Sequence, residues 1–311
     1  MDLDAYFGHQ AVPADYRSGF VGIIGRPNVG KSTLMNQILG QKIAIMSDKP
    51  QTTRNKIQGI YTDEAYQIIF LDTPGIHKPH HKLDEYMNKA ANSIIKDVDI
   101  LFYLVDATAR PGSGEEYIAK QLKTASAPVF LVINKIDLLR PEQILKVIQH
   151  YSRLLPFAEV VPVSALTGEN VEELLTTLRK YLPKGPQYYD PDQVTDQPER
   201  AIMAEIIREK IFLNTREEIP HSVAVVISDY TARDNGALYI GAVIYVERES
   251  QKGIIIGKGG AMLKKIGSAA RPEIENLFGN RVFLEIRVKV KKDWRDKENL
   301  LKNFGYDKKE L

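Results

Sequence analysis

Short apolar runs alternate with amphipathic helical periods over the first part of the chain. The runs predict strands at residues 20–24, 57–61, 66–71, 99–105, 128–133 and 159–163, and the periods predict helices near residues 31–39, 83–96, 114–125, 142–155 and 170–181. Residues 100–105 are apolar at every position, which is typical of a strand buried on both faces of a mostly parallel sheet. Because only a short turn at Asp63 and Glu64 separates the second and third strands, we expect them to form an antiparallel hairpin at the sheet's edge. The pattern therefore predicts an α/β domain.

The pattern changes after residues 183–199, which combine Pro, Gly and acidic residues without a period and predict a linker. Beyond it the order α-β-β-α-α-β is expected. Its parts are a helix near residues 199–213, strands at 223–228 and 237–246, a strand-like run at 254–256 leading into a glycine group and a helix, a second helix around 273–278, and a strand at 282–290. We therefore divide the chain into a flexible leader (1–18), a first domain (19–182), the linker (183–199) and a smaller α+β domain (200–311).

Composition restricts the possible classes of protein. A length of 311 residues is natural for two domains. The absence of cysteine excludes disulfides, thiolate metal sites and thiol nucleophiles. An acidic N-terminus and the lack of a long apolar stretch predict neither export nor a membrane span. The net charge is +2, with a small excess of basic residues in the second domain.

A phosphate-binding loop is predicted between the first strand and the first helix. The segment fits the pattern G-x-x-x-x-G-K-[ST], and with the following threonine it comprises Gly25, Arg26, Pro27, Asn28, Val29, Gly30, Lys31, Ser32 and Thr33. Its glycines allow backbone N–H groups to turn inward around an anion at the positive end of the helix. We expect Lys31 to reach the β- and γ-phosphates and Ser32 to bind Mg²⁺. The alternative is a glycine-rich turn without a ligand, against which the further motifs argue.

Guanine specificity is predicted from Asn134, Lys135 and Asp137, which follow the strand at 128–133. The Asp137 carboxylate can accept hydrogen bonds from N1–H and the 2-amino group of guanine, whereas adenine would leave that charge unpaired. We expect Asn134 to brace the pocket and the Lys135 stem to cover the purine. A later strand is followed by a segment whose middle N–H can donate to the guanine O6, and this segment is Ser164, Ala165 and Leu166. The nucleotide is therefore predicted to be GTP or GDP.

Two further segments carry candidate switch residues. The strand at 66–71 ends in Asp72, Thr73, Pro74 and Gly75. At this position Asp72 can hold Mg²⁺ through water and the Gly75 N–H can contact the γ-phosphate, although a simple turn is the alternative. In the polar segment 51–54 a threonine hydroxyl can complete the metal shell, and we favour Thr53 over Thr52. The predicted catalytic set is Lys31, Thr53 and Gly75, and the predicted metal ligands are Ser32, Thr53 and Asp72.

Taken together and in this order, these blocks resemble the translation-factor class of GTPases. The match with the Era family is close in G-R-P-N-V-G-K-S-T-L, P-Q-T-T-R and F-L-D-T-P-G, and it covers residues 19 to about 305. The resemblance implies a P-loop GTPase domain with a mostly parallel sheet, followed by a smaller α+β KH domain, and Mg²⁺-dependent hydrolysis of GTP to GDP. At the position where Ras-like enzymes carry a water-orienting glutamine this chain has Ile76, and the Era family also has a hydrophobic residue there. Related P-N-x-G-K loops also imply a K⁺ site at Asn28, with loop stabilisation as the alternative role.

The second domain contains a G-x-x-G turn in a basic setting. From residue 251 to 271 there is no acidic residue, and the predicted RNA contacts are Gly257, Lys258, Gly259, Gly260, Lys264 and Lys265. An exposed helix face explains some of these charges but not their lack of acidic partners. By resemblance, the partner is single-stranded ribosomal RNA from the 3′ region of the small-subunit rRNA, and the task is small-subunit assembly. The resemblance also implies a monomer in the cytoplasm, and allows peripheral association with the inner face of the cell membrane.

Three functions remain open at this point. The first is a GTP-switched RNA-binding factor. The second is a GTPase that docks on anionic membrane surfaces through its basic C-terminal domain, because positive patches attract phospholipid and RNA alike. The third is a constitutive RNA scaffold whose nucleotide is structural.

Overall fold

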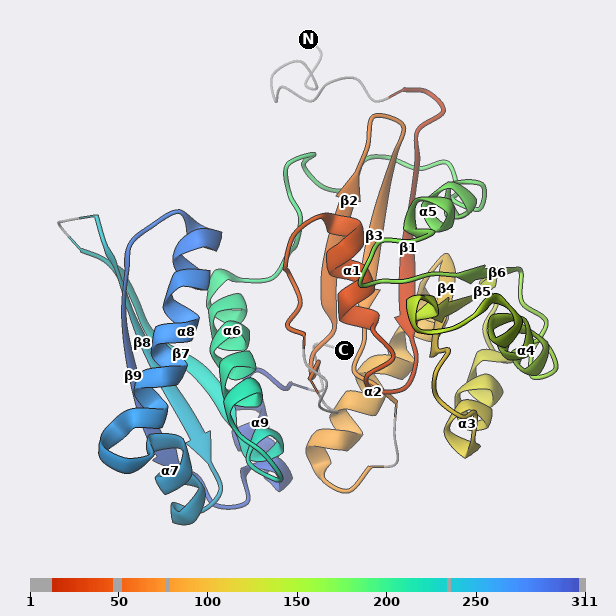
Figure 1. Ribbon diagram of the computed structural model, residues 1–311. Helices are drawn as coiled ribbons and strands as arrows, with labels where there is room; N and C mark the ends of the chain where they lie inside the picture. The colour runs from red at the N-terminus through yellow and green to blue at the C-terminus, as the bar shows by residue number, and fades with distance from the viewer. Residues whose placement is uncertain (1–12, 47–51, 77–78, 234–235, 308–311) are drawn as a thin grey trace, which may run out of the picture. The chain divides into compact units, whose positions relative to one another are not determined.

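The computed structural model describes residues 13–46, 52–76, 79–233 and 236–307 (Figure 1). The chain divides into two compact units that interleave in sequence. The first unit comprises residues 1–42, 56–76 and 91–196, and the second comprises residues 43–55, 77–90 and 197–311. Two short segments that follow the phosphate-binding loop and the D-T-P-G motif therefore pack with the C-terminal domain.

The first unit is built on a six-stranded sheet with the order β2-β3-β1-β4-β5-β6. Its strands are β1 (Arg17–Ile24), β2 (Ile57–Thr62), β3 (Tyr66–Asp72), β4 (Ile100–Asp106), β5 (Val129–Asn134) and β6 (Glu159–Pro162). All neighbours pair in parallel except β2, which pairs antiparallel with β3 at the edge of the sheet. The predicted α/β domain and its edge hairpin are confirmed. β1 begins two residues earlier than the predicted domain boundary, at the end of the expected leader.

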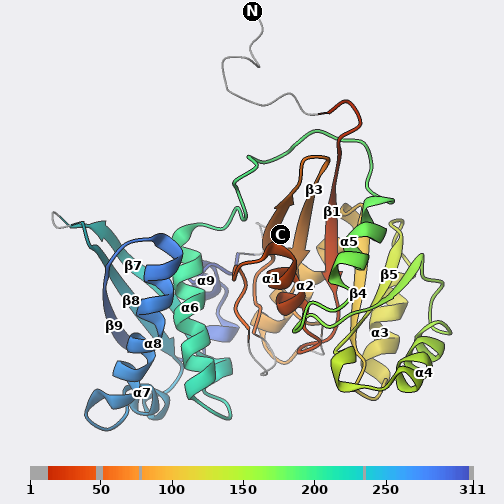
Figure 2. The ribbon, with the colours of Figure 1, turned by 45° about the horizontal axis from the view of Figure 1, so that its top comes forward.

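Helices cover both faces of this sheet. They are α1 (Lys31–Leu39), α2 (Lys82–Asp97), α3 (Ser113–Leu122), α4 (Pro141–Tyr151) and α5 (Val171–Arg179), with a short 3-10 turn, η1 (Ile136–Leu138), after β5. Only the second half of α2, from Ala91 on, belongs to the first unit. α1 and α5 lie on one face, and α3 lies on the other (Figures 1 and 2). Because the parallel strands all end at the same edge, the loops that follow β1, β3, β4 and β5 gather there.

Residues 183–198 of the predicted linker form no helix or extended strand but are attached to the first unit, and its last residue, Glu199, already begins α6. The backbone N–H of Ile60 on β2 donates to the carbonyl oxygen of Val194 at 2.9 Å, and the Thr195 hydroxyl donates to the carbonyl oxygen of Gln58 at 2.6 Å. These bonds use backbone groups on an edge strand that would otherwise face solvent.

The second unit contains a three-stranded sheet with the order β7-β8-β9. Its elements are α6 (Glu199–Asn214), η2 (Pro220–Ser222), β7 (Ala224–Ala232), β8 (Leu238–Val246), α7 (Glu249–Ile256), η3 (Lys258–Gly260), α8 (Ala261–Phe278), β9 (Val282–Val290), η4 (Trp294–Asp296) and α9 (Glu298–Asn303). β7 and β8 are antiparallel, and β8 and β9 are parallel. α6 and α8 pack on one face of the sheet (Figures 1 and 2). The predicted α-β-β-α-α-β order is correct.

Two assignments within that order were wrong. Residues 254–256, expected as strand-like, form the last turn of helix α7, whose start is capped by the Gln251 side chain as it accepts the Arg248 N–H at 3.1 Å. Residues 273–278, expected as a separate helix, are the end of α8, which continues through Pro272. Three residues of α8 four positions apart, Ile266, Ala270 and Ile274, are fully buried. Their packing against the sheet outweighs the one backbone hydrogen bond that proline removes.

Candidate nucleotide and RNA sites

The phosphate-binding loop depends on a glycine at its tightest point. Gly30 adopts a left-handed φ of 99°, directly before α1 begins at Lys31. A Cβ atom at this position would lie 2.2 Å from the Asn134 Nδ2 atom. Any larger residue would therefore be strained in its backbone and would clash with the side chain that braces the loop.

Lys31 lies in the interior of the loop that it completes. Its Nζ donates to the carbonyl oxygens of Arg26 at 2.9 Å and Gly25 at 3.3 Å. Burial lowers the pKa of Lys31 to about 8, and the negative charge of Asp72 offsets part of this effect. A buried ammonium held by neutral carbonyls is well placed to gain from an anionic ligand.

Two of the predicted metal ligands meet across the loop. The Ser32 hydroxyl at the start of α1 donates to Asp72 Oδ2 at the end of β3, at 2.6 Å. Hydroxyl and carboxylate oxygens are the ligands that Mg²⁺ prefers, so this pair fits a magnesium ion that also binds phosphate. The third predicted ligand, Thr53, is buried and belongs to the second unit. Its role on the metal stays a prediction.

The D-T-P-G segment packs closely on the phosphate-binding loop. A Cβ at Gly75 would lie 2.6 Å from the backbone nitrogen of Pro27, and the Ile76 N–H donates to the carbonyl oxygen of Gly25 at 3.3 Å. Only glycine allows this approach. The Ile76 side chain is 4% exposed and lies in the core among residues of β4 and β5. A buried hydrocarbon cannot orient a water molecule, which agrees with the expectation from the sequence.

Asn134 joins three loops of the nucleotide site. Its Nδ2 donates to the carbonyl oxygen of Val29 at 2.8 Å, and its Oδ1 accepts the Ala165 N–H at 2.9 Å. The side chain is almost fully buried. Asn134 thus holds the phosphate-binding loop and the S-A-L loop in fixed positions, as the sequence predicted of a bracing residue.

Asp106 is a residue of this site that sequence reasoning missed. Its Oδ2 accepts a hydrogen bond from the Lys135 Nζ at 2.6 Å, and the same Nζ donates to the carbonyl oxygen of Asn28 at 3.0 Å. Burial alone would raise the pKa of Asp106, but hydrogen bonds from Lys135 and Thr108 lower it overall. Its place as the last residue of β4, at the edge where the loops gather, was the available signal. The pair fixes the Lys135 side chain beside the phosphate-binding loop, and its role in covering the base stays a prediction.

The remaining candidates divide into packed and exposed residues. The Thr73 hydroxyl donates to the carbonyl oxygen of Ile23 at 2.8 Å and is fully buried. Arg26 forms an ion pair with Glu115 at 2.8 Å. Asp137 and Leu166 are exposed, and Leu166 has 76% of its surface accessible. An exposed carboxylate is suited to the polar edge of a base, and an exposed apolar side chain is suited to its flat face.

The G-x-x-G turn lies between two helices, α7 and α8. Gly257, Gly259 and Gly260 have φ values of 72°, 58° and 82°, all in the left-handed region. A Cβ at Gly259 or Gly260 would meet open space, so the requirement there is conformational. The turn places backbone N–H groups at the positive end of α8, which is a favourable position for a phosphate.

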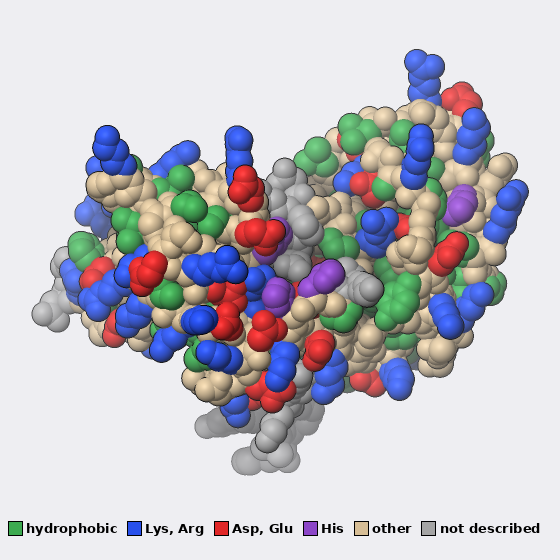
Figure 3. Space-filling model, turned by 90° about the horizontal axis from the view of Figure 1, so that it is seen from below, with side chains coloured by type: hydrophobic (Ala, Val, Ile, Leu, Met, Phe, Trp, Pro, Cys, Tyr) green, Lys and Arg blue, Asp and Glu red, His purple; other side chains and the backbone are tan. Residues whose placement is uncertain are grey.

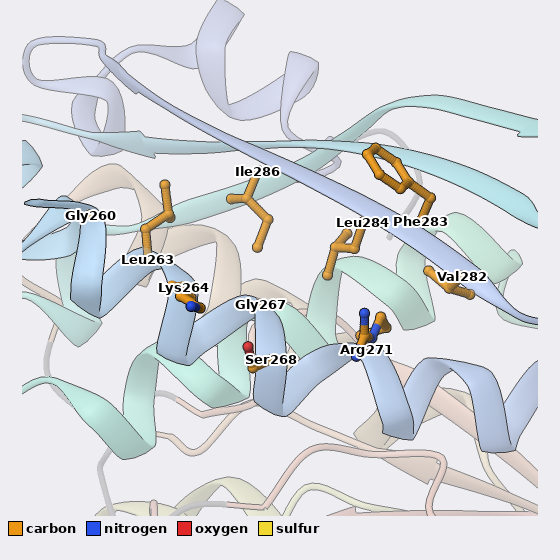
Figure 4. A pocket seen from close by; sticks show the side chains of 10 residues that line it. All are labelled: Gly260, Leu263, Lys264, Gly267, Ser268, Arg271, Val282, Phe283, Leu284 and Ile286. Carbon is orange, nitrogen blue, oxygen red and sulfur yellow. The ribbon is translucent and has the colours of Figure 1, made fainter.

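A groove of about 410 Å³ runs from this turn between α8 and β9. Figure 4 shows its lining, with Leu263, Lys264 and Arg271 from the helix and Leu284 and Ile286 from the strand. A Cβ at Gly267 would lie 3.3 Å from Ile286 Cδ1, so glycine keeps the floor of the groove open. The groove combines an apolar floor with a basic rim.

The basic residues around the turn and groove differ in their partners. Lys252 lies 3.8 Å from Glu249 on the same helix. Within the described part of the chain, Lys258, Lys264, Lys265 and Arg271 form no ion pair, and all four are exposed. Elsewhere basic and acidic side chains alternate over the visible surface (Figure 3). Four unpaired cations close together around one turn and groove favour an anionic ligand.

Comparisons with known proteins agree with both domains. Residues 20–135 match the family model described as 50S ribosome-binding GTPase, and residues 218–295 match the KH domain model. A crystal structure of Era in complex with MgGDPNP and nucleotides 1506–1542 of 16S ribosomal RNA is 42% identical in sequence, covers 94% of this chain, is itself covered to 99%, and has a TM-score of 0.91. A variant of Aquifex aeolicus Era bound to GDP·AlF₄⁻ has the same identity and coverage, with a TM-score of 0.90.

The fold and the sites thus define a P-loop GTPase with a C-terminal KH domain. Identity of 42% over nearly the whole of both chains is specific to a family. The chain belongs to the Era family of GTPases, which confirms the resemblance and the fold class expected from its sequence.

Proposed function

We propose that this protein is a GTP-switched factor that binds single-stranded ribosomal RNA at the 3′ region of the small-subunit rRNA and acts in small-subunit assembly. The observation that carries the proposal is the open groove between α8 and β9, whose rim holds cations without acidic partners. The same chain carries a nucleotide loop, and the Era complex that it resembles over both domains contains 16S ribosomal RNA.

In the nucleotide site, Lys31 binds the β- and γ-phosphates, because among the described residues its buried charge donates hydrogen bonds to neutral carbonyls alone. Ser32 and Asp72 hold the magnesium ion, and Thr53 joins them when the γ-phosphate is present. Mg²⁺ supplies positive charge to the phosphate oxygens during transfer. The Gly75 N–H contacts the γ-phosphate. Asp137 reads the guanine edge, and Asn134 braces the pocket. The Ala165 N–H, expected to donate to the guanine O6, donates to Asn134 Oδ1 in this structure.

In the RNA site, the G-x-x-G turn approaches the sugar–phosphate backbone, and bases enter the groove. A KH groove holds about four splayed nucleotides. Lys258, Lys264 and Lys265 neutralise phosphates near the turn. The apolar floor formed by Leu263, Leu284 and Ile286 takes the base faces. Duplex RNA does not expose its bases in this way, so the ligand is single-stranded.

The small subunit is favoured over the large one. The GTPase model carries a 50S description but matches only residues 20–135, whereas the Era complex with 16S RNA matches both domains. We place the protein in the cytoplasm, as a monomer. Of the described helices, none is long and apolar enough to cross a membrane. No observation supports docking on a membrane surface.

Binding of labelled RNA in three nucleotide states tests the proposal. The probe is nucleotides 1506–1542 of 16S rRNA, with the full-length protein in GDPNP, in GDP and without nucleotide. Binding that is tighter in GDPNP is expected. Equal binding in all three states would indicate a constitutive scaffold. Binding to anionic phospholipid vesicles without binding to RNA would overturn the proposal in favour of the membrane function.

The double variant Lys258→Asp, Gly259→Asp tests the KH groove itself. It places negative charge where the phosphate comes closest, so binding of single-stranded RNA should fall by at least an order of magnitude, with the GTP turnover of the free protein unchanged. Duplex RNA of the same length serves as the control ligand. If single-stranded and duplex RNA weaken by the same factor, the turn belongs to a non-specific basic surface, and the KH groove is not the binding site.

A further inference from the structure

The face of the second sheet that points away from α6 and α8 carries an aromatic and basic cluster. The Tyr239 ring on β8 and the Phe283 ring on β9 are stacked across neighbouring strands, with centroids 6.0 Å apart and planes inclined by 20°. The guanidinium carbon of Arg233 lies 4.9 Å from the Tyr239 centroid and 4.7 Å from the Phe283 centroid. We call Arg233, Tyr239 and Phe283 the sheet platform.

Two residues of the platform are open to solvent, and Tyr239 is half-buried. Phe283 has 53% of its surface exposed, and Arg233 is exposed. The other end of the same face is covered, because Tyr245 stacks on Phe304 just after α9 at 4.5 Å. An exposed large aromatic that is held in position by a neighbour has stacking area available for a ligand.

Charge on this face favours a polyanion. Strand side chains alternate between faces, so the odd-numbered positions from 281 to 291 share the side of Phe283. They are Arg281, Phe283, Glu285, Arg287, Lys289 and Lys291. Among these positions of β9 the one acidic residue, Glu285, is already paired with Arg287 at 2.6 Å and accepts the Tyr239 hydroxyl at 2.8 Å. A further carboxylate, Asp229 on β7, lies on the same face beside Gly241, so basic residues still outnumber acidic ones there.

The platform is continuous with the KH groove through β9. Val282, Phe283, Leu284 and Ile286 all line the groove, and the Phe283 ring is turned away from α8 toward the other side of the strand (Figure 4). β9 is an edge strand of its sheet, so a chain leaving the groove can pass around it without crossing another strand. Strand β9 thus takes part in both surfaces, because side chains on one of its faces form the groove wall and Phe283 on the other face belongs to the platform.

We propose that the sheet platform is a second contact for RNA, binding nucleotides that flank those held in the groove, with a base stacked on the Phe283, Tyr239 and Arg233 cluster. Proteins that bind single-stranded nucleic acid combine stacking aromatics with basic side chains in this way. The core of a protein interface is instead depleted of charge, which argues against a protein partner. The inference rests on the proposed RNA function and extends the RNA footprint beyond the groove.

Affinity as a function of RNA length tests the proposal. The ligands are nucleotides 1506–1542 of 16S rRNA and a nested set of truncations, each titrated with the full-length protein in GDPNP. Phe283→Ala should weaken binding of the longest RNA about tenfold, the loss expected for one stacked base, and should leave the shortest RNA that still binds unaffected. Arg233→Ala should act in the same direction, and Phe283→Trp should restore affinity because indole keeps the stacking face. Tyr117→Ala, which removes a 51% exposed aromatic on α3, is the matched control and should change nothing.

The outcomes separate this inference from the function on which it rests. If the wild type binds no RNA of the set, the proposed function itself fails. A second case is that the wild type binds RNA, the Lys258→Asp, Gly259→Asp variant binds none of the RNAs, and Phe283→Ala changes the affinity for none of them. The groove is then the RNA-binding site, and the platform is not a contact. An equal loss for short and long RNA on Phe283→Ala would show that the substitution acts through the groove wall, which also overturns the proposal. One more outcome would overturn the proposal: Phe283→Ala weakens binding of the protein to anionic phospholipid vesicles but does not weaken its binding to RNA.

Discussion

The guanidinium of Arg54 donates a hydrogen bond to the backbone carbonyl of Val223 at 2.6 Å, directly before β7 begins. It also donates to the carbonyl oxygens of His221 at 3.0 Å and Pro220 at 3.4 Å, and its carbon lies 5.8 Å from the centre of the Trp294 ring. Arg54 is 1% exposed. The residue next to the predicted metal ligand Thr53 is therefore a buried part of the second unit.

This burial makes Arg54 a residue of structural importance for the second unit. Arg54→Ala leaves buried carbonyl oxygens without their donor and should lower the free energy of unfolding by about 3 kcal/mol. Arg54→Lys should recover only part of this, because an ammonium cannot reproduce the planar fork. Urea denaturation followed by fluorescence of Trp294, the protein's single tryptophan, measures the change in the same cluster. The exposed Arg216→Ala is the control, and an equal loss there would contradict the assignment.

Lys31 should take up a proton when nucleotide binds at alkaline pH. Its pKa in the free protein is lowered by burial to about 8, and bound phosphates raise it again. At pH 8.5 the free amine is mostly neutral, so binding of GDP should consume about three-quarters of a proton from solution. Below pH 7 the group is already charged and uptake through it should vanish.

Calorimetric titration in buffers of different ionisation enthalpy measures this uptake. Lys31→Arg is the control, because a guanidinium stays charged throughout the range. The same proton uptake in wild type and Lys31→Arg at pH 8.5 would place the titrating group elsewhere.

Asp137 should decide which base is bound. Asp137→Asn replaces an acceptor by a donor, so GTP binding should weaken about a hundredfold while xanthosine triphosphate, whose 2-oxo group needs a donor, should bind better than it does to wild type. Competition against a fluorescent nucleotide measures both. Unchanged GTP affinity would mean that another residue reads the guanine edge.

Hydrolysis should be faster in potassium than in sodium. Ile76 is buried and cannot position water, and a cation held near the Asn28 side chain can neutralise charge in the transition state. Asn28 has a left-handed φ of 65°, so Asn28→Gly keeps the loop conformation and removes only the side chain. Turnover in the two salts should then become equal. If the glycine variant retains the potassium response, Asn28 only stabilises the loop.

The sequence alone predicted those features that are set within short stretches of chain. Strand and helix positions in the first unit follow from the period of apolar residues, and β9 was predicted at its exact limits, residues 282–290. Lys31 and Ser32 were predicted from the G-x-x-x-x-G-K-[ST] spacing between a strand and a helix, and Asp72 from the D-T-P-G motif at the end of a strand. Spacing and side-chain chemistry are local properties, so they can be read without coordinates.

Only the tertiary structure decided the features that depend on partners distant in sequence. The pairing of Lys135 with Asp106, and the burial of Arg54 against carbonyl groups more than 160 residues away, have no local signature. Helix α7 also lacks a local signature, because its three successive isoleucines have an intrinsic preference for a strand. Ile255 is fully buried in the core, and that packing together with the Gln251 cap favours the helix. Packing energy comes from the whole core, and it overrides the local preference of a few residues.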